Sequence, residues 1–135
     1  MVSFIIPGEC VPQARPRFQA TRYGVHTYEP EKCRKYKERV KACAMAAMRD
    51  RVPMGGAIGV LIRTYRHYPK RMTKEQRKHP EDMPPVTRPD VDNLAKAVLD
   101  GMNGICYMDD AQITTLTVSK EYGEEPYVRV EIWED

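Results

Sequence analysis

The sequence predicts a single mixed α/β domain over residues 1–135, with two main helices and elements in the order β-(β)-α-β-α-β-β. Its length is that of one ordinary domain, and no repeat or linker divides it. Two segments carry apolar residues at helical spacing. Several short runs, rich in β-branched and aromatic residues, are bounded by proline or glycine and predict strands.

The first half of the chain begins with a predicted strand at residues 2–6, which Pro7-Gly8 ends. A second short extended stretch is expected at 22–28. A helix is predicted from Pro30 to Arg49, because apolar residues recur there at i, i+4, i+7, i+8, i+11 and i+12. These are Tyr36, Val40, Cys43, Ala44, Ala47 and Met48. Residues 57–65 predict the next strand.

The second half opens with residues 66–86, which hold four prolines and six Lys/Arg against three acids. They predict a long loop with a helical turn near 73–78, and a loop of this length usually has a function. Because Pro89 biases the residue before it towards extended geometry, the second helix is expected at 90–103. Its predicted buried face contains Val91, Leu94, Ala95, Val98 and Met102. Strands are expected at 105–107, 113–122 and 127–133.

The composition describes a soluble globular protein, with 41% apolar and 30% charged residues. No apolar run approaches the roughly 20 residues that span a bilayer, so we expect no membrane association. The start of the chain does not resemble a signal peptide, so a cytoplasmic location is expected. The four cysteines form no CxxC pair, which favours reduced thiols over a disulfide framework or a zinc site.

Charge is distributed unevenly along the chain, although the net charge is only +3. Residues 1–89 hold 19 Lys/Arg and 8 Asp/Glu, a balance of +11, whereas residues 90–135 hold 3 and 11, a balance of −8. The first part suits a polyanion such as nucleic acid, and the second concentrates carboxylates that suit a metal ion. Solvated charge segregated by chance is the alternative explanation.

Carboxylates are the main candidates for a functional site. Asp90 and Asp92 stand at the expected start of the second helix, where capping and the helix dipole would also explain them. Capping does not explain the adjacent pair Asp109-Asp110, because neighbouring acids repel one another unless a cation lies nearby. After the Asn103-Gly104 turn, we expect this pair to fold back beside the helix start. Oxygen ligands of this kind suit Mg²⁺.

These motifs also carry a family resemblance. The run Asp90-Val-Asp-Asn-Leu-Ala-Lys96, the helix end Leu99-Asp-Gly-Met-Asn-Gly104 and the run Tyr107-Met-Asp-Asp-Ala-Gln-Ile113 resemble the RusA-type Holliday junction resolvases. The opening Ile6-Pro-Gly and the following Pro12-Gln-Ala-Arg-Pro-Arg17 resemble that family's basic amino-terminal loop. The likeness spans nearly the whole chain, and a RusA-like endonuclease domain is the fold it implies.

The resemblance implies a catalytic site made of Asp90, Asp92, Asp110 and Lys96. The three aspartates would bind Mg²⁺, with Mn²⁺ as an expected substitute, and Asp109 is a further candidate ligand. The metal would activate a water and stabilise the leaving oxygen, while Lys96 would neutralise charge that grows on the phosphate.

Three other residues in these motifs have weaker expected roles. The resemblance implies that Asn93 and Gln112 hydrogen-bond to the carboxylates. Asp100 is expected as a surface acid or a helix-end contact rather than a metal ligand. Two symmetric cuts in a four-way junction imply a homodimer as the working form.

Basic residues form the expected DNA-binding surface. Arg15 and Arg17 flank a proline in the amino-terminal loop, and the long loop adds Lys70, Arg71 and Lys74. Arg88 adjoins the carboxylates and is expected to touch the cleaved strand. Tyr23, Tyr28, Tyr65 and Tyr68 lie near these charges, and we weigh stacking on exposed bases against core or interface packing for them.

The leading hypothesis is therefore a Mg²⁺-dependent endodeoxyribonuclease that resolves Holliday junctions or other branched DNA by paired cleavage. A DNA-binding protein that kept the fold but lost cleavage is the second hypothesis, and the intact acids and Lys96 argue against it. A phosphotransferase of the haloacid dehalogenase kind is the third. It needs an apolar strand before its first aspartate, whereas Thr87-Arg-Pro89 precedes Asp90 here.

Overall fold

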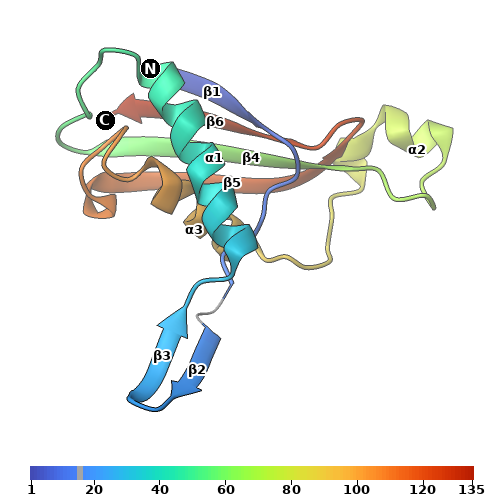
Figure 1. The fold of residues 1–135 in the computed structure, drawn as a ribbon. Helices are drawn as coiled ribbons and strands as arrows, with labels where there is room; N and C mark the ends of the chain where they lie inside the picture. Colours follow the sequence, from blue (N-terminus) through green and yellow to red (C-terminus); the bar gives the residue numbers. More distant parts are fainter. Residues whose placement is uncertain (15–16) are drawn as a thin grey trace.

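The computed structural model describes residues 1–14 and 17–135, which form a four-stranded sheet with its main helices packed on one face (Figure 1). The strand order is β1-β6-β4-β5. The bounds are β1 (Val2–Pro7), β6 (Tyr127–Glu134), β4 (Ile58–His67) and β5 (Ile113–Gly123). Strand β6 pairs antiparallel with β1 and β4, whereas β4 and β5 are parallel. This arrangement confirms the predicted mixed α/β class.

The core lies between the sheet and two helices, α1 (Glu31–Met48) and α3 (Val91–Met102). Alternate residues of the central strands point into it and are fully buried: Ile58, Val60 and Ile62 on β4, and Val128, Val130 and Ile132 on β6. The helices touch each other where Gly101 lies against Val40. A Cβ atom on Gly101 would lie only 2.6 Å from the Val40 Cβ, so this close approach requires glycine.

Both helices agree with their apolar stripes to within one residue at each end. Pro30 precedes α1 as its N-cap, and Asp90 precedes α3. One predicted core residue is wrong, since Val91 is 42% exposed. Val91 is the first residue of α3, and the buried stripe begins one turn later, at Leu94.

Two predicted strand assignments also differ from the structure. Residues 105–107 form a turn rather than a strand, and Tyr107 makes only isolated bridges with Met54 and Asn103. The stretch expected at 22–28 is one half of a hairpin, in which β2 (Arg17–Thr21) pairs antiparallel with β3 (Gly24–Tyr28). This hairpin is a separate two-stranded sheet that projects from the body of the molecule (Figure 1).

The long segment after β4 leads from the end of that strand to a short helix, α2 (Lys74–Lys78), and a 3-10 turn, η1 (Pro80–Asp82), which lie beyond one end of the sheet (Figure 1). The Thr73 hydroxyl accepts a hydrogen bond from the Gln76 N–H, and the Gln76 side chain accepts one from the Thr73 N–H. This reciprocal cap confirms the predicted helical turn. In the described residues, no helix is both long enough and apolar enough to cross a membrane.

Candidate active site

The start of α3 presents two exposed carboxylates. The backbone of Asp90 is extended, with φ −78 and ψ 151, and its side chain makes no capping hydrogen bond. Asp92 lies in the first turn. Among the described residues, neither acid forms an ion pair. Capping therefore does not account for Asp90, and both carboxylates are available to a ligand.

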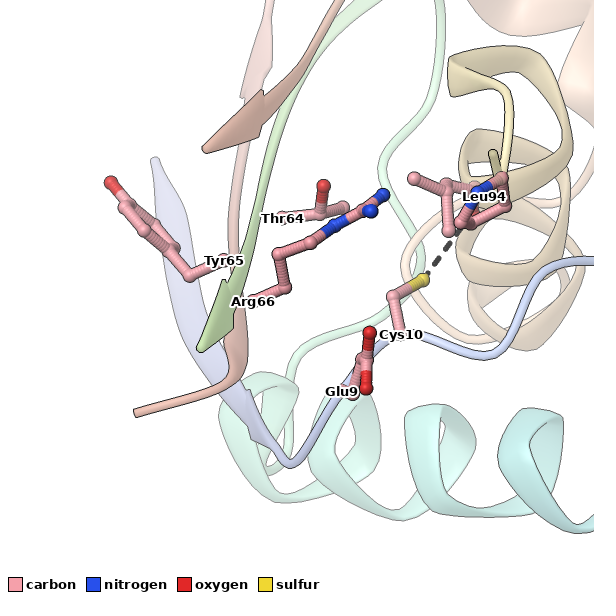
Figure 2. Close-up of a pocket in the computed structure, with 7 residues that line it drawn as sticks. Glu9, Cys10, Thr64, Tyr65, Arg66 and Leu94 are labelled. Atoms are coloured by element: carbon pink, nitrogen blue, oxygen red, sulfur yellow. Dashed lines mark hydrogen bonds between the residues drawn. The ribbon is translucent and has the colours of Figure 1, made fainter. Parts of the chain in front are cut away.

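Two cations hold the backbone that leads into Asp90. The Lys120 ammonium, on β5, donates to the carbonyl oxygens of Thr87 at 2.9 Å and Pro89 at 3.1 Å. The Arg66 guanidinium, on β4, donates to the Thr87 hydroxyl and to the Arg88 carbonyl, both at 3.3 Å. Figure 2 shows Arg66 reaching from β4 towards Leu94 of α3. These four contacts fix the residues before Asp90 against the sheet.

Neither of these two cations is predicted from the sequence to have a role at this site. A signal for Lys120 was present, because it alternates with Val118 and Tyr122 on the side of β5 that faces the helices. A lysine at an inward-facing position needs a partner for its charge, and backbone carbonyls supply one here.

The amino-terminal segment is also attached to the first turn of α3. The Gln13 N–H donates to the Asn93 carbonyl at 3.0 Å, and the Cys10 thiol lies 3.9 Å from the Leu94 carbonyl (Figure 2). Burial raises the pKa of Cys10 to about 11, so this thiol stays neutral and serves packing. All four cysteines are free, as predicted.

Asp109 and Asp110 lie at the other end of α3. The Asp109 carboxylate accepts the Ala111 N–H at 2.9 Å and caps a short 3-10 turn, η2 (Asp110–Gln112). One carboxylate oxygen of Asp110 accepts from the Asn103 side-chain amide at 3.2 Å. Asn103 is the C-cap of α3, so the expectation that this acidic pair folds back beside the helix start is wrong.

The chain turns tightly after α3, which explains the position of Asp110. The Gly104 N–H donates to the Tyr107 carbonyl at 2.7 Å, and the Tyr107 hydroxyl donates to the Leu99 carbonyl at 2.8 Å. Burial, together with the negative charge of Asp110, raises the pKa of Tyr107. The neutral, buried phenol therefore anchors the turn to the last part of the helix.

Because Asp110 lies beside Asn103, most of the length of α3 separates it from Asp90 and Asp92. Asn103 follows Asp92 by eleven residues, which at 1.5 Å per residue is about 16 Å along the helix axis. Ligands that share one Mg²⁺ each lie only about 2.1 Å from it. In the part of the chain that the structure describes, no three His, Cys, Asp or Glu side chains are grouped closely enough to hold a metal.

The ammonium of Lys96 pairs with Asp100, at 3.7 Å, rather than with Asp92. Asp100 also pairs with Lys37 of α1 at 3.7 Å, and Lys37 in turn pairs with Glu29. A hydrogen bond from Lys37 lowers the pKa of Glu29. Asp100 is thus a contact between helices, in line with its expected minor role, and it holds Lys96 at one end of an ionic chain.

One implied role is wrong. The Gln112 amide donates to the backbone carbonyls of Met54 at 2.9 Å and Gly56 at 3.0 Å, and its side-chain oxygen accepts from the Asp109 N–H at 3.1 Å. It therefore fixes the loop before β4 and the η2 turn rather than binding a carboxylate. For Asn93, the hydrogen bond present is the one that its backbone carbonyl accepts from Gln13, and it does not involve the side chain.

The candidate DNA-binding residues occupy separate places. Lys70, Arg71 and Lys74 are exposed on the segment after β4, and Arg88 is exposed beside Asp90. Arg15 lies outside the described residues, as does the side chain of Arg17, whose backbone begins β2. A shallow groove next to the start of α3 is lined by Pro12, Gln13, Arg88, Pro89, Asp90 and Asn93.

The fold is a mixed α/β domain, in which α3 carries Asp90 and Asp92 at its start and Asp110 beside its end. The family model for endodeoxyribonuclease RusA matches residues 7–133. The chain therefore belongs to the RusA family of endodeoxyribonucleases. It is also similar to the uncharacterized protein YqaN of Bacillus subtilis (strain 168), with 36% identity over 137 aligned positions that cover 98% of this chain and 96% of YqaN.

Proposed function

We propose that this protein is a Mg²⁺-dependent, structure-selective endodeoxyribonuclease that resolves four-way DNA junctions by paired cleavage as a homodimer. Membership of the RusA family supports deoxyribonuclease activity on branched DNA. The observation that carries the proposal for this chain is the exposed pair Asp90 and Asp92, neither of which forms an ion pair with a described residue, with Lys96 one turn further along the same helix.

The donor chemistry of this helix start fits a hard divalent cation. Asp90 and Asp92 offer carboxylate oxygens, and Lys120 and Arg66 fix the preceding backbone so that Asp90 is not free to drift. Bound there, Mg²⁺ would supply Lewis acidity at the cleaved phosphate. Asp110 is the third proposed ligand, with Asp109 confined to a supporting role by its capping hydrogen bond.

A second copy of the chain offers the way to bring Asp110 to the other acids. In a two-fold dimer with the α3 helices antiparallel, the start of one helix would meet the end of its partner. Exposed apolar side chains flank this helix: Val91 is 42% exposed, Met108 66% and Leu116 45%. Such side chains favour burial against another surface, so we propose that dimerisation completes each metal site.

The cations have distinct proposed roles. Lys96 would exchange its Asp100 contact for a non-bridging oxygen of the cleaved phosphate, where it would offset growing negative charge. Arg88, exposed in the groove beside Asp90, would bind the adjacent phosphate. Lys70, Arg71 and Lys74, together with Arg15 and Arg17, would hold the DNA arms.

A protein that binds branched DNA without cutting it is the alternative function. The observation that favours it is the absence of any three-acid group among the described residues of one chain. Such a protein would bind a junction with the same charge dependence, but metal would not lead to cleavage.

The deciding experiment offers the protein a synthetic mobile four-way junction and a linear duplex, each with Mg²⁺ and with EDTA. We expect paired nicks near the branch in the junction with Mg²⁺, no cleavage with EDTA, and little cleavage of the duplex. Tight junction binding without cleavage at any divalent metal would establish the alternative, and equal cleavage of both substrates would contradict structure selectivity.

A further inference from the structure

The tip of the β2–β3 hairpin presents two large side chains, Arg22 and Tyr23. Thr21 and Gly24 form the last pair of the hairpin, so the turn has two residues. Turns of this length usually use glycine, asparagine or aspartate. Gly24 takes the positive φ of +128, and Arg22 and Tyr23 keep negative φ values. Turn chemistry therefore permits these two side chains but does not require them.

The turn is fixed by the Thr21 side chain. Its hydroxyl donates to the Gly24 carbonyl at 2.9 Å and accepts from the Tyr23 N–H at 3.3 Å. The tyrosine itself is 93% exposed. A phenol ring this exposed adds nothing to the core, so the earlier alternative of core packing does not apply to Tyr23. The Thr21 hydrogen bonds thus hold a backbone whose tyrosine ring is open to a second molecule.

Among the described side chains of the hairpin, apolar surface lies beside the charge of Arg22. Val25 is 69% exposed and Tyr28 is 45% exposed. No acid occurs in the sequence between Glu9 and Glu29, a stretch that carries three arginines. A matching partner has flat apolar faces and negative charge, and DNA with unpaired bases has both.

The hairpin begins at the rim of the candidate active site. Gln13, shortly before β2, donates its N–H to the Asn93 carbonyl at 3.0 Å, and its side chain donates to Glu29 at 3.1 Å. The groove beside Asp90 includes Gln13 in its lining. Five residues per strand at about 3.3 Å each give the hairpin a reach of roughly 16 Å.

We propose that the hairpin is an arm that stacks the Tyr23 ring on an unpaired base at the branch of the DNA substrate, with Arg22 on a neighbouring phosphate. This inference rests on the proposed function and names a residue that selects the substrate. Bases inside a duplex are already stacked on both faces, whereas a base at a branch can offer a free face. Because every base has such a face, the contact selects structure rather than sequence.

The hairpin arm is connected to the candidate active site by ion pairs, so the contact between Tyr23 and a base also bears on where the DNA is cut. Glu29, the residue after β3, pairs with Lys37, and Asp100 links Lys37 to Lys96. The root of the arm is therefore tied to the proposed catalytic lysine. A base held by Tyr23 fixes the distance between the branch and the phosphate that is cut.

The test uses the full chain in EDTA, so that cleavage plays no part. A four-way junction carries 2-aminopurine at the branch, and a linear duplex of the same sequence carries it at the same position. We expect the wild-type protein and Tyr23→Phe to change the fluorescence of the junction probe. Tyr23→Ala should lose that change and bind the junction about tenfold more weakly, with duplex affinity within about twofold.

Val52→Ala is the matched control, because Val52 is also an exposed apolar residue, at 80%, in the loop after α1. It should leave both affinities unchanged. If wild type prefers the junction and Tyr23→Ala retains both that preference and the fluorescence change, the role of Tyr23 is overturned while the proposed function stands. If wild type shows no preference for the junction, structure selectivity itself fails, and the role of Tyr23 fails with it.

Discussion

The two ends of α3 carry acids in opposite circumstances. At the start, Asp90 and Asp92 are exposed and make no ion pair among the described residues. At the end, Asp109 caps a turn and Asp110 accepts a hydrogen bond from Asn103. From the sequence, capping is expected to explain Asp90 but not Asp109, and the structure shows the reverse for these two residues.

This difference shows that hydrogen bonding to backbone N–H groups distinguishes an acid with a folding role from an acid that is available to bind a ligand. An acid that satisfies a backbone N–H has a folding role, and Asp109 has one. An acid at a helix start that leaves the N–H groups unsatisfied, as Asp90 does, is available for a ligand. Asp110 stands between these cases, because it accepts a hydrogen bond from the neutral Asn103 amide, which leaves carboxylate lone pairs free.

The largest effect is expected from substitutions that remove charge but keep shape. Asp92→Asn should abolish junction cleavage in Mg²⁺ while leaving junction binding equal or tighter, because the lost charge holds metal and also repels phosphate. Asp109→Asn should retain cleavage and leave the melting temperature nearly unchanged, because the asparagine oxygen can still cap η2. A nicking assay beside a gel shift measures both, and cleavage by Asp92→Asn near the wild-type rate would remove Asp92 from the site.

Mixing two inactive variants tests whether the two ends of α3 meet across a dimer. If the partner's Asp110 completes the site around Asp92, a heterodimer of Asp92→Asn and Asp110→Asn subunits contains one intact site and one site with both changes. An equal mixture after subunit exchange should then nick junctions at about a quarter of the wild-type rate, without paired cleavage. Each variant alone should be inactive.

Sites formed within one chain would give the opposite result. Each site in the heterodimer would then carry one substitution, and the mixture would stay inactive. A mixture of Asp90→Asn with Asp92→Asn is the matched control. Both residues lie at the same helix start, so this mixture should stay inactive in either arrangement.

Lys96→Ala should lower the cleavage rate about 10²-fold, the range found when one transition-state contact is lost. Lys96 is exposed, and its ion pair among the described residues is with Asp100, which keeps a second partner in Lys37, so the protein should stay folded. Single-turnover cleavage and a thermal melt separate these effects. Normal cleavage with a lower melting temperature would make Lys96 a helix-stabilising residue.

The exposed basic segment after β4 should affect binding rather than the chemical step. Reversing Lys70, Arg71 and Lys74 to Glu should weaken junction binding and reduce the slope of log K against log salt by about 2.7, or 0.9 for each lost phosphate contact. Titrations at several salt concentrations measure the slope. An unchanged slope would place the DNA path elsewhere on the molecule.

The sequence predicted the helices well because their signals are local. The stripes in α1 and α3 each require only that apolar residues recur on one face. The position of Asp110 depends instead on long-range contacts. Tyr107 bridges to Met54, and Gln112 donates to Gly56, across more than fifty residues of sequence. No spacing rule within residues 103–112 contains that information.

The hairpin and the backbone contacts before Asp90 were hidden for other reasons. Strand β2 does alternate, but Phe18 and Ala20 are its only two apolar residues and it directly follows a proline-rich basic run, so this short pattern was too weak to distinguish Arg17–Thr21 from a loop. The role of Lys120 depends on where Thr87 and Pro89 cross the edge of the sheet, which only the fold determines. The motif therefore suggested candidate ligands, whereas for Lys120 the sequence indicated an inward-facing position but not the contacts that it makes.

Lys120→Met is expected to give the smallest effect, because Lys120 is proposed to position Asp90 and not to take part in the cleavage step. It removes two hydrogen bonds to the backbone before Asp90, at a cost of about 1–2 kcal/mol in the free energy of unfolding. Because Asp90 would then be less well placed, the Mg²⁺ concentration for half-maximal cleavage should rise about tenfold, the lower end of the range for residues that orient metal ligands. Junction affinity in EDTA should be unchanged, and Lys120→Arg, which keeps a donor, should restore most of the loss.

If Lys120→Met lowered the melting temperature but left the Mg²⁺ requirement unchanged, Lys120 would stabilise the sheet edge without positioning Asp90. If Lys120→Met weakened junction binding in EDTA, the Lys120 ammonium would be a DNA contact. The hydrogen bonds from Lys120 to the backbone before Asp90 would then not explain why Asp90, unlike Asp110, is held ready for a metal.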